Sequence, residues 1–138
     1  MSAQFDTKIA VVLREDLAVW QKLNVTAFTV SAVAGATAGL LGEPYVDASG
    51  LTYLPMVRQP MLIFSGDATA VRRAYERALA RDVPLAIFTE ELFTTGHDDA
   101  NRAAVRAVAS ADLQLVGLAF RTEKRVADKV LKGLALHQ

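Results

Sequence analysis

Cysteine is absent from this 138-residue chain. Its absence excludes disulfide bonds, thiol nucleophiles, thiolate metal sites and iron–sulfur clusters, and it is typical of a reducing compartment. Net charge is absent as well, because 15 lysines and arginines balance 15 aspartates and glutamates. This balance argues against a protein that binds nucleic acid mainly by electrostatic attraction, since such binding grows with the number of phosphates neutralised.

The N-terminal residues lack a cationic segment followed by an apolar run, so we expect no signal peptide and a cytoplasmic location. One uncharged run, Leu23–Leu41, is nineteen residues long, which is enough to span a bilayer. Threonine, serine and asparagine side chains dilute it, and it directly follows a strand-like segment. We therefore interpret it as a helix buried within the fold and expect no membrane partner.

Strand-like and helix-like segments alternate along the chain. The continuous apolar run Lys8–Leu13 predicts a strand that is covered on both faces. Further strands are predicted at Met61–Phe64, Pro84–Phe88 and Leu113–Phe120, and helices at Trp20–Leu41, Ala68–Arg81, Asp98–Ser110 and Thr122–Leu131, the last capped by Thr122. No linker or repeat divides the chain, so residues 1–138 are expected to form a single α/β domain with a mostly parallel sheet wrapped by helices.

Ligands of open α/β sheets usually bind beyond the carboxyl ends of the strands. Three segments follow predicted strands in this way: Arg14–Gln21, Ser65–Thr69 and Thr89–His97. The middle segment is best interpreted as a tight turn in which Asp67 caps the next helix. The first and third segments therefore carry the candidate site.

Polar side chains of the first segment and of the helix after it suggest anion binding. Arg14 could bind a carboxylate or phosphate as a bidentate donor, with Asp16 beside it, or the two could form an ion pair that fixes the turn. Lys22 could neutralise an oxyanion near a helix N-terminus, and Asn24 could orient a carbonyl group. The alternatives are a solvated lysine and an amide that caps the backbone.

The third segment holds the densest group of polar residues. Glu90 could act as a general base on water, Thr94 or Thr95 could position a substrate, and His97 could share the proton transfer. Alternatively, Thr95 or Asp98 caps the following helix and the glutamates are surface charges. The two histidines of the chain lie far apart, so we expect no metal site, and we expect no cofactor.

The opening Lys8-Ile-Ala-Val-Val-Leu-Arg-Glu-Asp-Leu17, followed by Lys22 and a helix rich in small residues, resembles the start of the type II peptidyl-tRNA hydrolases. The later order of strands and helices and the closing segment Lys129–Leu136 are also similar to that family. More closely, the chain resembles a bacterial family of unknown function with the same fold. The resemblance implies a three-layer α/β/α sandwich, a four-stranded mixed sheet with one strand opposite to the rest, and a homodimer.

The chain departs from the hydrolase pattern at positions that matter for chemistry. In a gapless alignment the hydrolase lysine falls on Leu23, and Lys22 matches only with a one-residue gap. The hydrolase glutamine and helix histidine are missing, and the Asp-Ala-Gly-x-Thr segment falls near Thr89–Thr94 without its aspartate or glycine.

Two functions stay open. One is hydrolysis of an ester or amide bond in a tRNA-like or small anionic substrate, with Lys22 and Glu90 at the reacting centre. The other is non-catalytic binding of a small anionic ligand or a nucleotide.

Overall fold

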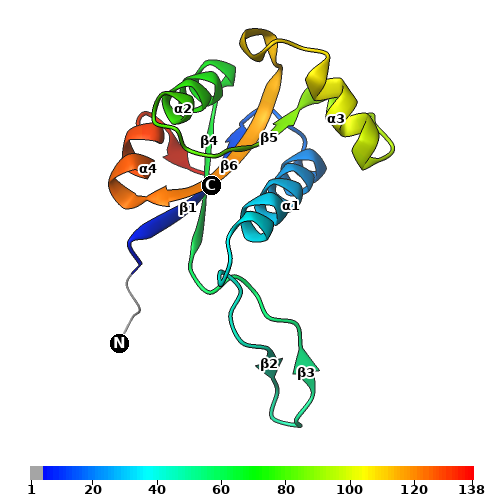
Figure 1. The fold of residues 1–138 in the computed structure, drawn as a ribbon, viewed down its shortest axis with the longest axis vertical. Helices are drawn as coiled ribbons and strands as arrows, with labels where there is room; N and C mark the ends of the chain where they lie inside the picture. Colours follow the sequence, from blue (N-terminus) through cyan, green and yellow to red (C-terminus); the bar gives the residue numbers. More distant parts are fainter. Residues whose placement is uncertain (1–4) are drawn as a thin grey trace.

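The computed structural model describes residues 5–138 (Figure 1). These residues form, in chain order, β1 (Thr7–Arg14), α1 (Val19–Ala36), β2 (Tyr45–Val46), β3 (Thr52–Tyr53), β4 (Met61–Gly66), α2 (Ala68–Ala80), β5 (Ala86–Thr89), the 3₁₀ helix η1 (Glu90–Phe93), α3 (Asp98–Arg106), the 3₁₀ helix η2 (Ser110–Asp112), β6 (Leu115–Glu123), α4 (Lys124–Val130) and β7 (Ala135–Leu136). The α/β class and the four principal strands are therefore as predicted.

The main sheet has five strands within the described residues, in the order β5-β6-β1-β4-β7. Only the β1–β4 pair is parallel, whereas β1–β6, β5–β6 and β4–β7 are antiparallel. The expectation of a four-stranded, mostly parallel sheet was therefore wrong. Alternating strands and helices predict parallel neighbours only where each helix crosses over the sheet. Here β6 lies between β5 and β1 and runs against both.

Helices cover both faces of this sheet. Alternate β1 residues Ile9, Val11 and Leu13 face a core shared with α1, while Ala10 and Val12 face a core shared with α2 and α4. All five are at most 2% exposed. This two-sided burial explains why the first strand is apolar throughout rather than at every second position, as the sequence predicted.

Two helices end differently from the prediction. α1 stops at Ala36, five residues before the predicted end, and the next turn places Gly39 at φ 75°, a left-handed conformation that suits glycine. The last helix begins at Lys124 because Thr122 still pairs with Lys8 in the sheet, so Thr122 is not its cap.

α1 is not sealed from water, which corrects the interpretation of its uncharged sequence. Only Val25, Thr29 and Val33 are fully buried, and they form one line along the helix. Val19 and Leu23 are 74% and 67% exposed. Within residues 5–138, α1 and the other helices are too short or too polar to cross a membrane.

The carboxyl ends of β1, β4 and β5 lie at the same edge of the sheet. β1 is parallel to β4, and β6 runs against both β1 and β5, so Arg14, Gly66 and Thr89 all end their strands at this edge, with β6 between Thr89 and Arg14. The Glu15 amide donates to the Gly66 carbonyl at 2.8 Å and joins the first two predicted segments. This edge brings the predicted site residues within reach of each other.

Candidate functional site

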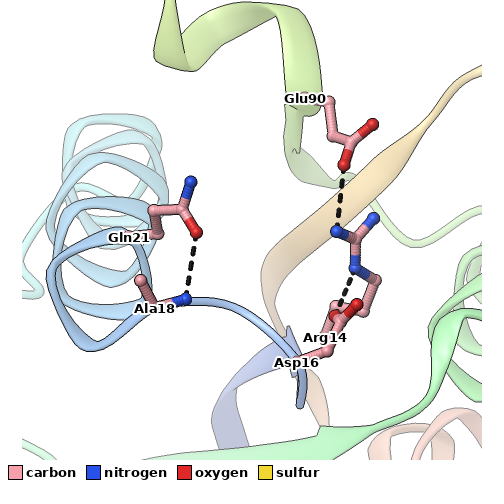
Figure 2. A network of polar contacts seen from close by, with 5 residues as sticks. All are labelled: Arg14, Asp16, Ala18, Gln21 and Glu90. Carbon is pink, nitrogen blue, oxygen red and sulfur yellow. Dashed lines mark hydrogen bonds and ion pairs between the residues drawn. The ribbon is translucent and has the colours of Figure 1, made fainter.

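Arg14 forms an ion-pair network at the carboxyl edge of the sheet (Figure 2). Its Nε lies 2.6 Å from Asp16 Oδ1, and its Nη2 lies 2.9 Å from Glu90 Oε1. The Arg14 side chain is 17% exposed, and that partial burial acts to lower its pKa, but the hydrogen bonds that it donates to Asp16 and Glu90 outweigh this effect and raise the pKa. Three predicted residues from two distant segments therefore meet, and both contacts are with carboxylates of this chain.

The neighbouring start of α1 is fixed by a side chain from within the helix. Gln21 Oε1 accepts a hydrogen bond from the Ala18 amide at 3.0 Å (Figure 2). A glutamine at this position satisfies a backbone donor that would otherwise be free at the helix start. The first turn of α1 is thereby held in place, and with it the orientation of Trp20 and Asn24.

A cleft lies between α1 and α3, with β5 and η1 at its base; we call it the α1–α3 cleft. It consists of two hollows of about 370 Å³ and 640 Å³ that have five lining residues in common, so they form one continuous trough. The shared residues are Phe28, Phe88, Leu92, Asp98 and Asn101. Each hollow alone has a volume in the range that small-molecule sites occupy.

Aromatic rings form much of the wall of the smaller hollow. Trp20 of α1 meets Phe93 edge-to-face with ring centroids 5.6 Å apart, and Phe93 lies 5.0 Å from Phe88. Phe28 completes the row at 6.2 Å from Phe88. Trp20 and Phe28 nevertheless remain 59% and 57% exposed. Two large apolar side chains are therefore open to solvent along a concave surface, which is unusual unless they contact a partner or ligand.

Polar side chains line the same hollow. Thr95 Oγ1 donates to the Leu92 carbonyl at 3.0 Å and also contacts Asn101 Oδ1. His97 Nδ1 accepts from the Ala100 amide at 3.2 Å and caps α3. The predicted cap, Thr95 or Asp98, was wrong for a geometric reason: His97 is the residue that stands just before the first helical turn.

Charges at the outer end of the cleft belong to α3. Asp98 and Asp99 both pair with Arg102, whose pKa they raise. One turn further, Arg106 has no carboxylate within 4 Å among residues 5–138 and lines the larger hollow. Arg106 is thus the cationic group at this end that is available to an anion.

The predicted site residues fall into two groups and two outliers. Arg14, Asp16 and Glu90 form the ion-pair network, and Asn24, Thr95 and His97 line the α1–α3 cleft. Thr94 is exposed, and its hydroxyl donates to the Glu91 carbonyl at 2.9 Å. Lys22 lies two residues before Asn24, so it projects roughly 200° away around α1 and belongs to neither group.

Sequence reasoning missed Phe28, Asn101 and Arg106. The signal for Phe28 was present, because Trp20, Asn24 and Phe28 recur every four residues and so share one flank of the helix. The roles of Arg106 and Asn101 could not be predicted, because the sequence does not indicate how far α3 lies from the sheet. The structure shows that every residue of α3 is at least partly exposed.

Within residues 5–138, no group of three or more histidine, aspartate or glutamate side chains is placed to hold a metal ion. Arg14 occupies the carboxylates of Asp16 and Glu90, and Arg102 occupies those of Asp98 and Asp99. The chemistry available at the cleft is therefore apolar contact, hydrogen bonding and pairing with an arginine.

Comparisons with known proteins give the same architecture without an activity. The structure titled protein of unknown function Atu0240, from Agrobacterium tumefaciens strain C58, is 45% identical and superposes with a TM-score of 0.96, covering 98% of this chain and all of that one. No protein with a curated description matches this chain. Residues 7–138 match the family described as protein of unknown function DUF2000, and the chain belongs to that family.

Proposed function

We propose that this protein binds a small amphipathic anion, without turnover, in the α1–α3 cleft. The observation that carries the proposal is the continuity of the two hollows, which gives an elongated trough with an aromatic wall and a free arginine at one end. Apolar pockets with a few polar groups that fix orientation are the usual form of a small-molecule site.

The lining defines the class of ligand. Phe28, Phe88 and Leu92 favour an aromatic or alkyl body, and Asn24 and Asn101 offer hydrogen bonds along its length. Arg106 favours a carboxylate or phosphate at the outer end, where a guanidinium can bind two oxygens at once. A monoanion with a flat apolar body meets these requirements.

The positions of the predicted catalytic residues favour binding over turnover. Glu90, the candidate base, pairs with Arg14 at 2.9 Å and does not line either hollow of the α1–α3 cleft. Lys22 lies on the other flank of α1. These placements support a ligand-binding role for the cleft.

Trp20 provides the test, because it is the single tryptophan of the chain and lines the cleft. We expect 1-naphthoate to change Trp20 emission and to raise the melting temperature in a saturable manner. The uncharged analogue 1-naphthalenemethanol should bind more weakly. Arg106→Gln should weaken 1-naphthoate binding by about tenfold while leaving the neutral analogue unaffected.

Two further variants separate the cleft from general surface effects. Ala32→Leu adds bulk to the larger hollow and should weaken both probes. Arg73→Gln removes an exposed arginine of α2, on the other side of the sheet, and should change neither. Unchanged emission and melting temperature with both probes would refute the proposal, as would equal effects of the Arg106 and Arg73 variants.

A second candidate function is hydrolysis on a fold like that of the type II peptidyl-tRNA hydrolases. The position of Arg14 and Asp16 at the carboxyl end of β1 favours it, because ligands of open α/β sheets usually bind at this edge. Release of N-acetylated amino acid from tRNA is the measurement, with Glu90→Gln and Lys22→Ala as variants. A rate equal to that of buffer alone would end this candidate and would leave the binding proposal intact.

A further inference from the structure

Residues 41–57 form an arm that stands away from the rest of the molecule (Figure 1). The arm is closed at its base by the bridge between Leu41 and Val57 and by the Gly42 amide, which donates to the Met56 carbonyl at 2.9 Å. Beyond this base it consists of the two-stranded hairpin β2–β3. An isolated two-stranded hairpin is at best marginally stable in water, so an arm of this kind normally contacts something.

The surface of the arm is largely apolar, whereas a hairpin that stays in water is expected to expose mainly polar residues. Seven large hydrophobic residues are exposed, from 51% at Leu41 and Tyr45 to 86% at Leu54; the others are Val46, Leu51, Tyr53 and Met56. Asp47 is the single charged residue between Pro44 and Met56. An exposed apolar surface of this extent is typical of an interaction site.

Asp47 stabilises the turn of the arm through hydrogen bonds to its side chain. Its Oδ1 accepts the amides of Ser49 and Leu51 at 2.9 Å and 3.0 Å, and its Oδ2 accepts the Tyr53 hydroxyl at 2.7 Å. These bonds fix the turn and direct the carboxylate back into the hairpin. Burial of the arm against a partner would therefore leave the Asp47 carboxylate hydrogen-bonded within its own hairpin.

The outer face of α1 is a second uncovered apolar surface. Val19 and Leu23 lie four residues apart, on the side of the helix away from the buried Val25, and Ala27 extends the same line. The rest of the helix beyond Leu23 carries no charge. A helix that is apolar on opposite sides is expected to be covered on both.

We propose that the partner is a second copy of this chain, and that the arm of each copy packs on the outer face of α1 of the other. Each chain carries one arm and one such helix face, so a twofold exchange covers both surfaces at once. The arm carries only the charges of Glu43 at its base and Asp47 in its turn, the outer face of α1 carries none, and the zero net charge of the chain gives no net repulsion between copies.

The exposed area matches what such an interface needs. The seven arm residues with Val19 and Leu23 each expose on the order of 100 Å², about half of a large side chain. Together they expose on the order of 900 Å² per chain, similar to the roughly 800 Å² per partner of a standard stable interface, and burial of most of this area requires contact with both faces of the hairpin. This inference is independent of the ligand proposed for the α1–α3 cleft.

The first test is the mass in solution by light scattering and sedimentation. We expect a dimer of the 14.9 kDa chain, converted to a monomer by Leu54→Asp and equally by Leu23→Asp. Leu79→Asp is the matched control, because Leu79 is 50% exposed on α2 and outside both surfaces. Unchanged circular dichroism and Trp20 emission would show that the variants remain folded.

The absence of cysteine makes the second test specific. The single variants Leu54→Cys and Leu23→Cys are mixed and oxidised, and we expect mainly the disulfide-linked product that contains one chain of each kind. A monomeric native protein would overturn the proposal, as would a dimer that resists both aspartate substitutions. Predominant linkage of position 54 to position 54 would overturn the exchange of arms.

Discussion

The two faces of the sheet are covered to different extents. On one face, α2 and α4 pack against the sheet and form a core of thirteen buried residues, among them Phe120, Val71 and Val130, each at 0% exposure. On the other face, α1 covers β1 and β6, but α3 stands off and leaves the α1–α3 cleft open. Both faces have a buried core, but one face is closed and the other also offers surfaces for binding.

The difference has its origin in the helices. α2 presents Val71, Ala74 and Tyr75 to the sheet and Arg73 and Glu76 to solvent, so it needs one covered side. α1 is apolar around much of its circumference and buries only one line of residues against the sheet. The apolar surface that remains on α1 faces the cleft on one flank and solvent on its outer side.

The largest expected effect contrasts one phenylalanine from each face. Phe120→Ala removes a fully buried ring under α2 and α4 and should lower the free energy of unfolding by about 3–5 kcal/mol. Phe28→Ala removes a ring that is 57% exposed in the cleft and should cost about 1 kcal/mol or less. Urea denaturation of both variants measures the contrast, and equal losses would contradict it.

The next effect concerns a close approach of α1 to the sheet at Gly117 of β6. A Cβ at Gly117 of β6 would collide with Val25 Cγ1 of α1 and lie 3.1 Å from the Val12 carbonyl oxygen. Gly117→Ala should therefore push α1 outward and destabilise the fold by about 1–3 kcal/mol. The loss is expected in thermal and urea unfolding alike.

Gly35→Ala is the matched control for this close approach. Gly35 lies in the last turn of α1, and a Cβ there would have open space around it among the described residues. Alanine is the better helix former, so the variant should gain up to about 1 kcal/mol. A loss at Gly35 as large as that at Gly117 would mean that helix propensity, and not the contact with β6, controls both positions.

These contrasts also show how far the sequence could predict the structure. The apolar run Lys8–Leu13 predicted a strand buried on both faces, because each of its residues needs cover regardless of which strands lie beside it. The pairing of that strand with β6 was not predictable, since local patterns do not say whether a connection crosses the sheet. The same limit applies to α3, whose distance from β5 depends on the loop at Thr94–His97.

The ion-pair network at the carboxyl edge of the sheet was predictable from the sequence, whereas the α1–α3 cleft was not. Arg14 and Glu90 each follow a strand, and the carboxyl edge of the sheet brought them together as expected. The cleft, in contrast, depends on which flank of α1 faces α3. Lys22 and Asn24 are two residues apart in sequence, yet only Asn24 lines the cleft.

A smaller effect is expected at Thr89, which ends β5 at the same edge. Thr89 is 1% exposed, and its hydroxyl has no hydrogen-bond partner in the part of the chain that the structure describes. Thr89→Val keeps the shape and removes the unsatisfied group, so it should stabilise the fold by about 1 kcal/mol. Thr89→Ser keeps the hydroxyl and loses a methyl group, so it should destabilise by a similar amount. A destabilising valine would show instead that the hydroxyl is bonded in solution.

The smallest expected effect is a pH-dependent change in the arm that the rest of the molecule should not show. The Tyr53 hydroxyl, followed by the Leu51 amide, lowers the pKa of Asp47 below its ordinary value of 3.8. A depressed pKa means that the ionised carboxylate stabilises the hairpin above pH 3.8, and that this contribution disappears as pH falls through the lower folded value. The Leu51 amide proton should therefore shift in NMR spectra only at the acidic end of a titration from about pH 7 to about pH 2. Asp47→Asn should abolish that step while amide protons of β1 behave identically in both proteins, and a step that persists in the variant would assign it to another group.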